Sequence, residues 1–375
     1  MSETILVTGG AGFIGSHLVD GLLERGDKVR VLDNLEPQVH GGLRERGEWP
    51  GYLRDCERIA GDVRDKDVLR CALQGVDVLY HLAAAVGVAQ SMYEIERYVD
   101  ANTRGTAVLL DVLANEPHSL RKLIVASSMS IYGEGAYRCP EHGRIHPRLR
   151  SEAQLAARDW EMRCPLCGQE VAPLPTGEEK PLYSTSVYAI TKKDQEELCL
   201  AVGRAYGMPT VALRFFNVYG PRQALSNPYT GVAAIFSGRL LNGLPPVIYE
   251  DGLQSRDFTH VSDIVQGLLL ALERDEMADG AYNVGTGRAL TILDVAHALI
   301  GHLDIEQEPE VVGRFRAGDI RHCYADVGRL AALGYAPGVR FEDGVAELVE
   351  WVRAQTAADR FEGAQVELAS RGLTK

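Results

Sequence analysis

Tyr188 and Lys192 form the pair of residues in this sequence that most directly suggests catalysis. They lie four residues apart in the segment SVYAITK. On a helix this spacing places the phenol and the ammonium group on one face, where the cation favours the phenolate and makes the tyrosine a usable base. Such a base beside a dinucleotide site indicates hydride chemistry at an alcohol carbon. The alternative is an exposed helix that carries an ordinary tyrosine and lysine.

A glycine-rich turn near the start of the chain, TGGAGFIG, predicts that dinucleotide site. Gly9, Gly12 and Gly15 fit the spacing GxxGxxG, and Gly10 in place of Gly9 fits GxGxxG. Residues without Cβ let the backbone approach a pyrophosphate at the N-terminus of the helix that begins at Phe13. The alternative is a tight strand-to-helix turn without a ligand.

Asp33 ends the second predicted strand 18 residues after Gly15. A carboxylate at this place accepts both ribose hydroxyls of NAD and repels the additional phosphate of NADP, so we expect NAD. Further cofactor contacts are expected at the ends of the following strands, although these residues also fit plain strand ends. The predicted cofactor residues of the turn and strand ends are Gly9, Gly12, Phe13, Ile14, Gly15, Asp33, Asn34, Asp62, Val63, Leu82, Ala83 and Ala84.

The elements that must position these residues alternate between strands and helices. Apolar runs predict strands at 4–7, 28–32, 58–60, 76–82, 122–127, 210–215 and 281–284, and helical periodicity predicts helices at 13–24, 65–73, 99–113, 185–206, 291–302 and 341–355. A doubly wound parallel (Rossmann) sheet of the α/β class accounts for this order. We divide the chain into a dinucleotide-binding domain (1–217), a smaller α/β substrate lobe (218–355) and a loosely attached C-terminal tail (356–375).

Length and composition predict a globular protein with a sizeable core. The chain has 375 residues, 46% of them hydrophobic, and a net charge of −13, which opposes non-specific binding to nucleic acid or an anionic membrane. Seven cysteines are an odd number and do not resemble a disulfide framework. With no signal peptide or membrane-spanning segment recognised, we expect a cytoplasmic protein with reduced thiols and no membrane or nucleic-acid partner.

Many motifs in register resemble the extended short-chain dehydrogenase/reductase family, specifically its NAD-dependent nucleotide-sugar 4-epimerases. They run from Ile5 to about Trp351 and are TGGAGFIGSHL, VLDNL, GDVRD, HLAAAVG, SSMSIYG, YAITK, RFFNVYGPRQ, SRDFTHVSD, YNVGTG and AGDIRHCYAD. Within this family the stretches AAAVGVAQSMYEI, SSMSIYGEG and ALSNPYTGVAAIF look most like dTDP-L-rhamnose 4-epimerases. The resemblance implies a bound NAD, a nucleotide-diphosphate sugar as substrate, and a homodimer formed through helices near 100–115 and 186–204.

The resemblance also implies roles for individual residues. Tyr188 and Lys192 match the catalytic base and its partner, Ser128 matches the catalytic Ser/Thr position, and Asn102 matches a position on the helix beside the cofactor. Tyr188 would take the proton of the sugar C4 hydroxyl while hydride passes from C4 to NAD. The 4-keto sugar would then turn over and receive the hydride on its opposite face, which inverts C4.

Met129 and Ser130 bear on the choice between branches of the family. Related sugar 4,6-dehydratases carry an Asp-Glu pair here, and glucuronate decarboxylases carry an acid one place further on. Neither Met nor Ser transfers a proton at neutral pH as a carboxyl group does. Epimerisation is therefore favoured. The alternatives are a UDP-sugar (glucose/galactose type) epimerase, a dehydratase, a net oxidoreductase, and an NAD-sensing scaffold protein without catalysis.

The resemblance places further residues at the nucleotide sugar. Arg256 and Arg316 match positions that grip the diphosphate, which suits guanidinium groups. Asp319 matches a position that meets a ribose or sugar hydroxyl. The full predicted substrate set is Val86, Ser128, Met129, Ser130, Asn217, Asn227, Arg256, Arg316 and Asp319.

Two short motifs in an insertion at about 135–180 predict a zinc site. The motifs CPEHG and CPLCG place Cys139, His142, Cys164 and Cys167 as two pairs of possible ligands. Three thiolates and one imidazole form a tetrahedral structural site without an open position. The insertion lacks sheet or helix periodicity apart from a possible helix at 152–160, so a metal would supply its folding energy. The alternative is a loop with four unligated side chains.

Overall fold

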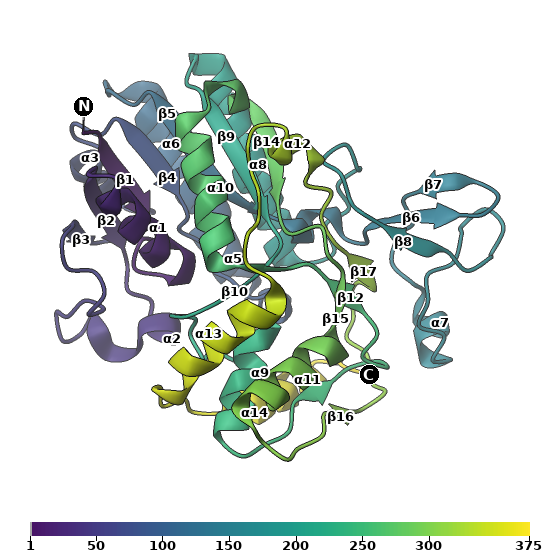
Figure 1. Cartoon of the computed structure of the whole chain (residues 1–375). Helices are drawn as coiled ribbons and strands as arrows, with labels where there is room; N and C mark the ends of the chain where they lie inside the picture. Colours follow the sequence, from purple (N-terminus) through teal and green to yellow (C-terminus); the bar gives the residue numbers. More distant parts are fainter. Residues whose placement is uncertain (1) are drawn as a thin grey trace.

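Seven parallel strands form the central sheet of the computed structural model, which describes residues 2–375 (Figure 1). Their order is β14-β9-β5-β4-β1-β2-β3, so the predicted doubly wound sheet is confirmed. The strands are β1 (Thr4–Thr8), β2 (Lys28–Asp33), β3 (Glu57–Ala60), β4 (Val78–His81), β5 (Lys122–Ser128), β9 (Thr210–Phe215) and β14 (Gly280–Val284). Because both faces of the sheet are covered, most of these strands are continuous apolar runs.

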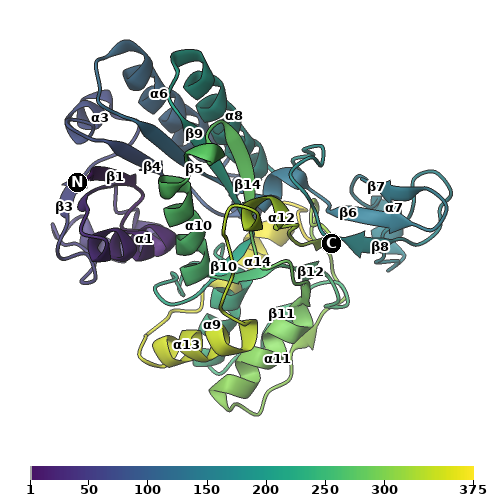
Figure 2. The same cartoon turned by 45° about the horizontal axis from the view of Figure 1, so that its top comes forward.

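Helices cover the two faces of the sheet separately (Figure 2). On one face α1 (Phe13–Glu24) packs against α10 (Val261–Glu273), and their apolar residues join those of the strands in one core. On the other face α3 (Lys66–Ala72), α6 (Gly105–Asn115) and α8 (Val187–Tyr206) enclose a second core. The strand order reverses beside β1, and the carboxyl ends of β1 and β4 therefore border a crevice of the kind in which such sheets bind ligands.

The substrate lobe has a core of its own, built from α9 (Val232–Leu241), α11 (Ile292–Leu303) and α13 (Phe341–Arg353). Small sheets connect it to the central sheet. They contain β10 (Asn217–Tyr219) with β13 (Phe258–His260), β11 (Val247–Ile248) with β16 (Glu310–Val311), and β12 (Ser255–Arg256) between β15 (Leu290–Thr291) and β17 (His322–Cys323). Two elements beyond the predicted boundary at 217/218 associate with the central sheet: β14 is one of its strands, and α10 packs on one of its faces.

Short helices complete the connections. They are α2 (Pro37–His40), α4 (Val88–Ser91), α5 (Ile95–Tyr98) and α12 (Gly328–Ala331), with 3₁₀ turns at Gly41–Leu43, Met129–Tyr132 and Asp275–Met277. The helix predicted at 99–113 is divided into a π-helical segment, Val99–Arg104, and α6. None of the helices in residues 2–375 is both long and apolar enough to cross a bilayer.

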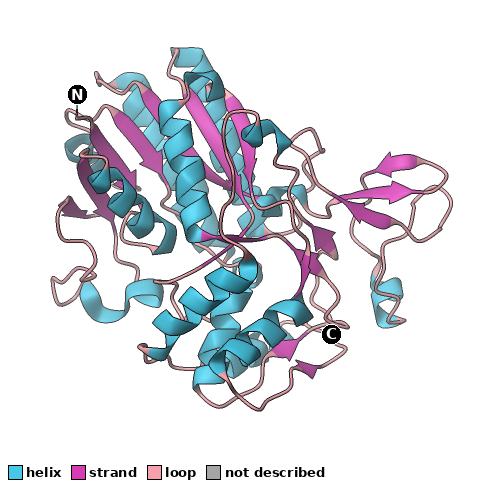
Figure 3. Ribbon diagram, viewed as in Figure 1, coloured by secondary structure: helices cyan, strands magenta, loops and turns pink. Residues whose placement is uncertain are grey.

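The insertion projects from the rest of the molecule as a separate small sheet (Figure 3). Its strands are β6 (Ala136–Cys139), β7 (Gly143–Ile145) and β8 (Ala172–Leu174), and its helix α7 (Glu152–Ala156) is shorter than predicted. The expectation of an insertion without sheet or core is wrong. Tyr137, Met162 and Val171 pack with Cys139 and Cys164 into a small buried cluster.

The C-terminal residues are not a loose tail. Helix α14 (Phe361–Ser370) buries Phe361, Ala364 and Leu368. The last residues pair with the substrate lobe, since the amide of Phe315 donates to the carbonyl of Lys375 (2.9 Å) and the reverse bond is also 2.9 Å. The apolar spacing 361, 364 and 368 is a helical signal that the sequence analysis missed.

Candidate active site and metal centre

One cavity of about 670 Å³ runs along the carboxyl ends of the central strands and into the substrate lobe. Every predicted cofactor and substrate residue lines it except Asn102. The residues come from segments that are far apart in the sequence, and the parallel sheet brings their strand ends together. The structure thus places the predicted cofactor turn, the predicted catalytic residues and the predicted substrate residues around a single space.

The glycine turn has the shape needed by a bound pyrophosphate. A Cβ on Gly15 would lie 2.7 Å from Cα of Gly10, and a Cβ on Gly9, whose φ is +73°, would lie 2.8 Å from the amide nitrogen of Ala83. Helix α1 starts after Gly12 without a side-chain cap, so its first amides are free of a capping side chain. Free amides at a helix N-terminus attract an anion, and the residues present therefore fit NAD.

Asp33 has a second role that the sequence analysis missed. Its Oδ2 accepts a hydrogen bond from the amide of Ala11 (3.0 Å), and its Oδ1 accepts one from the amide of Leu35 (2.8 Å). Burial raises the pKa of this carboxyl group. The residue expected to meet the adenine ribose thus also holds the glycine turn against the end of β2, while each oxygen retains a lone pair for a ligand.

Asp62 lies next to Asn34 at the same end of the cavity. Its Oδ2 accepts hydrogen bonds from the amide group of Asn34 (3.1 Å) and from Arg64 (2.7 Å). Burial acts to raise the pKa of Asp62, but the hydrogen bonds from Arg64 dominate and lower it to about 2. The group is therefore a fixed anion at neutral pH.

Asn102, which the sequence predicts as a cofactor residue, does not line the cavity. Its Oδ1 accepts a hydrogen bond from the amide of Ala85 (2.7 Å), and its Nδ2 donates to the carbonyl of Ala85 (3.0 Å) and to Thr191 (3.0 Å). The side chain is completely buried. It fixes the loop after β4 to α8, which positions cavity residues on both elements.

The predicted catalytic hydroxyl groups lie together at the end of β5. Ser130 donates a hydrogen bond to the Oγ of Ser128 (2.9 Å), and Ser128 lies near enough to the hydroxyl of Tyr188 to lower the pKa of that phenol. The ring of Tyr188 stands at 89° to that of Tyr98, with 6.5 Å between the centroids. The amide of Tyr188 also donates to Ser91 (2.9 Å). The backbone and the ring of the proposed base are thus both held.

Burial is the main influence on the pKa values of Lys192 and Tyr188. The ammonium group of Lys192 donates to Oε1 of Gln195 (2.7 Å), and burial lowers its pKa to about 8. Burial raises the pKa of Tyr188, and the hydrogen bond from Ser128 opposes this effect. The acidification of Tyr188 by Lys192 stays a prediction.

The positions that distinguish branches of the family contain no carboxyl group. Met129 is buried in an apolar cluster with Tyr132 and Phe216, and Ser130 is bonded to Ser128. Packing of Met129 in that cluster accounts for its apolar side chain. The nearby cavity acids Glu250 and Asp319 belong to the substrate lobe and are paired with arginines.

The predicted substrate residues contact one another across the lobe. Arg316 pairs with Asp319 (3.2 Å) and lies 4.3 Å from the ring centroid of Tyr249. Arg256 donates to three backbone carbonyls, including that of Ile320 (2.7 Å). Both guanidinium groups border the cavity, where positive charge suits a diphosphate.

Three uncharged residues of the predicted substrate set differ in their surroundings. The Oδ1 of Asn217 is buried and has no hydrogen-bond partner in the described part of the chain. The Oδ1 of Asn227 accepts from Gln38 (2.9 Å) and from the amide of Tyr229 (3.0 Å). Val86 is 55% exposed at the cavity wall. A buried amide without a partner at a cavity wall favours a polar ligand there.

Residues from the last helix were missed by the sequence analysis. Phe361, Ala364, Gln365 and Leu368 of α14 all line the cavity. Gln365 is hydrogen-bonded to the hydroxyl of Tyr249. The ring of Tyr249 makes the cation–π contact with Arg316. The C-terminal helix therefore forms part of the wall at the predicted diphosphate end.

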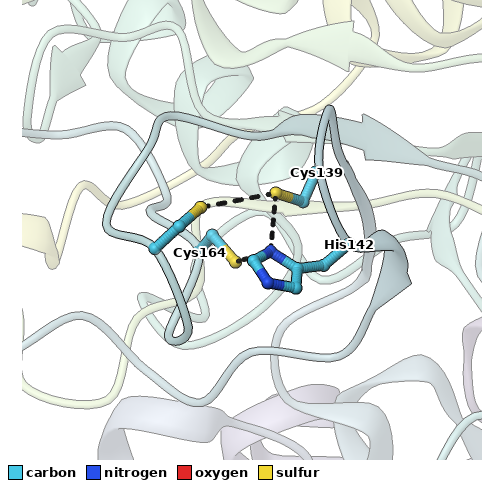
Figure 4. Close-up of side chains that lie close together, drawn as sticks. Cys139, His142 and Cys164 are labelled. Atoms are coloured by element: carbon cyan, nitrogen blue, oxygen red, sulfur yellow. Dashed lines mark hydrogen bonds between the residues drawn. The ribbon is translucent and has the colours of Figure 1, made fainter.

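The four predicted metal ligands converge in the insertion. Their ligand atoms all lie within 4.8 Å of one another, and Figure 4 shows Cys139, His142 and Cys164 pointing toward a common centre. The distances are 3.5 Å from Cys139 Sγ to His142 Nδ1, 3.6 Å from Cys164 Sγ to the same nitrogen, and 3.6 Å from Cys139 Sγ to Cys167 Sγ. Tetrahedral zinc bonds require separations of about 3.5–3.8 Å. The donor set therefore fits zinc.

The chain is similar in sequence and in structure to known nucleotide-sugar epimerases. The chain is 36% identical over 354 residues to a protein of Burkholderia thailandensis described as dTDP-L-rhamnose 4-epimerase, which covers 93% of this chain and 95% of that protein. It is 30% identical to the crystal structure of UDP-glucose 4-epimerase from Thermotoga maritima with UDP-glucose, with a TM-score of 0.75 and coverage of 93% and 98%. For the UDP-glucose 4-epimerase of Thermus thermophilus in complex with NAD, the identity is 31%, the TM-score 0.72 and the coverage 94% and 100%.

The family model described as "NAD dependent epimerase/dehydratase family" matches residues 5–152 and 167–285. These residues include the glycine turn, Ser128, Tyr188 and Lys192. The match covers more than half of the chain and includes most strands around the cavity. This chain therefore belongs to the NAD dependent epimerase/dehydratase family.

Proposed function

We propose that this protein is an NAD-dependent nucleotide-sugar 4-epimerase, most similar in its substrate to dTDP-L-rhamnose/dTDP-6-deoxy-L-talose epimerases. The observation that carries the proposal is the single cavity with the glycine turn, the Ser128–Tyr188 pair and two arginines on its walls. The absence of a carboxyl group at positions 129 and 130 supports epimerisation over elimination. Family membership and the relatives described above support the cofactor and the class of substrate.

Each residue of the catalytic group has a distinct task in this reaction. Tyr188 takes the proton from the C4 hydroxyl group and later returns it. Ser128 donates a hydrogen bond to the same oxygen, and the bond from Ser130 orients the hydroxyl of Ser128. Lys192, held by Gln195, lines the same cavity, and its positive charge when protonated would favour the phenolate form of Tyr188. NAD, when bound, supplies the reversible oxidation and reduction at C4.

The substrate end of the cavity supports a diphosphate with a mobile sugar. Arg256 and Arg316 would neutralise the two phosphates, and Asp319 or Asn217 would meet a hydroxyl group. A 4-keto sugar held chiefly by its diphosphate could turn over and present its opposite face. Inversion at C4 without net oxidation follows from this arrangement.

The proposal is tested with a panel of dTDP- and UDP-linked sugars. Each is incubated with the purified enzyme, and the products are examined by NMR for inversion at C4. We expect inversion of dTDP-L-rhamnose or its C4 epimer. Inversion only of UDP-glucose or UDP-galactose would replace the dTDP assignment, formation of a 4-keto-6-deoxy product would indicate a dehydratase, and indifference to every sugar would favour an NAD sensor.

We also propose that Cys139, His142, Cys164 and Cys167 hold a structural zinc ion. Three of the separations between ligand atoms, at 3.5–3.6 Å, match tetrahedral geometry, and all four ligand atoms lie within 4.8 Å of one another. The four side chains would occupy all four coordination positions of the zinc ion, so no open position remains for a water molecule or a substrate. The metal would hold the two turns of the insertion together and would take no part in the reaction at C4.

Replacing Cys164 by Ser is expected to lower zinc content from about one ion per chain to well below half, because one thiolate of the set is lost. Elemental analysis of chelator-washed protein measures the change. The control is Cys71→Ser, since Cys71 is exposed and lies outside the cluster. Equal zinc content in both variants, or a wild-type protein without metal, would contradict the site.

The domain division, assembly and location remain predictions. We propose a dinucleotide domain of residues 1–217 completed by α10 and β14, a substrate lobe from the rest of 218–355, and α14 as part of that lobe. A homodimer through α6 and α8 and a cytoplasmic location are the expectations from the family resemblance and the reduced cysteines. Sedimentation of the purified protein would test the dimer.

A further inference from the structure

A buried group of charged residues joins the insertion to the substrate lobe. Its centre is Arg321, whose side chain is completely buried. The guanidinium group donates to Glu161 of the insertion (3.0 Å), to Glu250 (3.0 Å) and to Asp251 (2.6 and 2.9 Å). Buried ions are costly unless they are paired, so the position of Arg321 depends on all three carboxylates.

A second arginine, Arg150 of the insertion, joins the same group. Arg150 donates to both oxygens of Glu250 (2.9 and 2.8 Å), and the side chains are only 1% and 4% exposed. Arg150 also donates to the carbonyl of Trp160, which precedes Glu161 (2.8 Å). The insertion therefore contacts the lobe through two guanidinium–carboxylate interactions. The pair of Arg150 with Glu250 is almost completely buried, whereas the Glu161 side chain beside the buried Arg321 is 32% exposed.

Glu161 is connected to the predicted diphosphate site through β17. One oxygen receives the guanidinium of Arg321, and the other lies 3.1 Å from Nε2 of His322. Nδ1 of His322 lies 2.8 Å from the hydroxyl of Ser255, which precedes Arg256. Strand β17 pairs with β12, which carries Arg256. A displacement of Glu161 would therefore disturb the strand that holds this arginine.

Arg256 depends directly on the backbone that Glu161 holds. Its guanidinium donates to the carbonyls of Arg321 (2.9 Å), Ile320 (2.7 Å) and Ser255 (2.8 Å). These three hydrogen bonds fix the orientation of the Arg256 guanidinium group at the cavity wall. The orientation of Arg256, the predicted diphosphate ligand, is thus set by the backbone of residues 320–321. The side chain of Arg321 is in turn held by Glu161 of the insertion.

Glu161 also lies beside the proposed zinc site. It is three residues before Cys164, and the next residue, Met162, accepts the amide of Val171 (3.1 Å) within the metal-binding turn. The family model does not match residues 153–166, which contain both Glu161 and Cys164. The link from the metal to β17 is therefore made by a segment outside the matched family core.

We infer that Glu161 is a positioning residue that couples metal occupancy of the insertion to binding of the nucleotide diphosphate by the substrate lobe. The inference rests on the proposed function and on the proposed zinc site. Metal binding holds the segment that carries Glu161. Glu161 then holds Arg321 and His322, and these hold the backbone that directs Arg256. Loss of either the metal or the carboxylate weakens diphosphate binding and leaves the chemistry at C4 unchanged.

The first test is Glu161→Gln in the full chain with NAD and zinc bound. We expect the dissociation constants of dTDP and UDP, measured by calorimetry, to rise about tenfold, because Arg321 and His322 lose the carboxylate that holds them to the insertion. KM for the sugar nucleotide should rise with kcat within about twofold. NAD and zinc content should stay equal to the wild type. Glu161→Asp, which retains the charge, should recover part of the affinity.

The matched control is Glu170→Gln, an exposed glutamate of the same insertion. It should bind dTDP and UDP as the wild type does. Unchanged binding in Glu161→Gln would overturn the inference alone, whereas a wild-type protein that binds neither nucleotide would overturn the proposed function. Loss of zinc in Glu161→Gln would also overturn the positioning role, since the effect would then arise from the metal site itself.

The second test removes the metal from both proteins with a chelator. In the wild type we expect the dissociation constant of dTDP to rise by a similar factor, about tenfold. In Glu161→Gln the metal should make little further difference, because the link that transmits its effect is already broken. Independent, multiplying effects would overturn the coupling, as would purified wild-type protein that contains no metal.

Discussion

Replacement of Tyr188 by Phe is expected to lower the rate of C4 inversion by about 10³-fold, within the range of general acid–base catalysis. The substitution removes only the hydroxyl group that exchanges the proton. The ring and its edge-to-face contact with Tyr98 remain, so the fold should persist. Initial rates with the sugar identified by the panel, together with the melting temperature and bound NAD, measure the effect.

Tyr206→Phe is the matched control for this experiment. Tyr206 is the last residue of the same helix, α8, and is 61% exposed. Its variant should keep the wild-type rate. If Tyr188→Phe retained more than a tenth of the activity with the same melting temperature, the assignment of Tyr188 as the base would be rejected.

Gly15→Ala is expected to weaken NAD binding by about 100-fold, or about 2.7 kcal/mol. A Cβ at this position would overlap with the carbonyl of Gly9 and with Cα of Gly10, both of which are backbone atoms. The turn must open to admit the methyl group, and this displaces the amides at the start of α1 from the pyrophosphate. NAD content after gel filtration, and titration of the stripped protein with NAD, measure the loss.

Gly301→Ala provides the same substitution without the overlap. Gly301 lies in α11, where no atom lies within 4 Å of an added Cβ. Alanine there should bind NAD normally and stabilise the helix slightly. Equal NAD affinity in Gly15→Ala and Gly301→Ala would show that the glycine turn does not hold the cofactor.

The sheet and the glycine turn could be predicted because their signals are local. An apolar run followed by glycines and a helical period is visible within about thirty residues, and the alternation of strands and helices then allows few topologies. The metal ligands were equally visible, since each pair lies within one turn of the chain. These predictions depend on neighbours in sequence, and the structure places the residues accordingly.

Predictions that required the direction of a side chain were less accurate. The position of Asn102 beside the cofactor helix was identified, but its amide group turns to Ala85 and Thr191. Lys192 lies on the expected face of α8, but its ammonium group donates to Gln195. In both cases a buried polar group takes the partners that its surroundings offer: Asn102 bonds to residues of other segments, and Lys192 bonds to a residue of its own helix.

The sequence by itself determined the parallel sheet, the glycine turn at its edge, the placement of Tyr188 and Lys192 on one helix and the two Cys/His pairs of the insertion, because short-range periodicity and spacing encode them. Only the tertiary structure decided that α14 forms a wall of the cavity, and that Glu161, which is 160 residues away in the sequence, pairs with the completely buried Arg321. The physical reason is desolvation. The pKa of a buried group and the choice of its partner depend on which distant elements exclude water around it, and no local pattern records this.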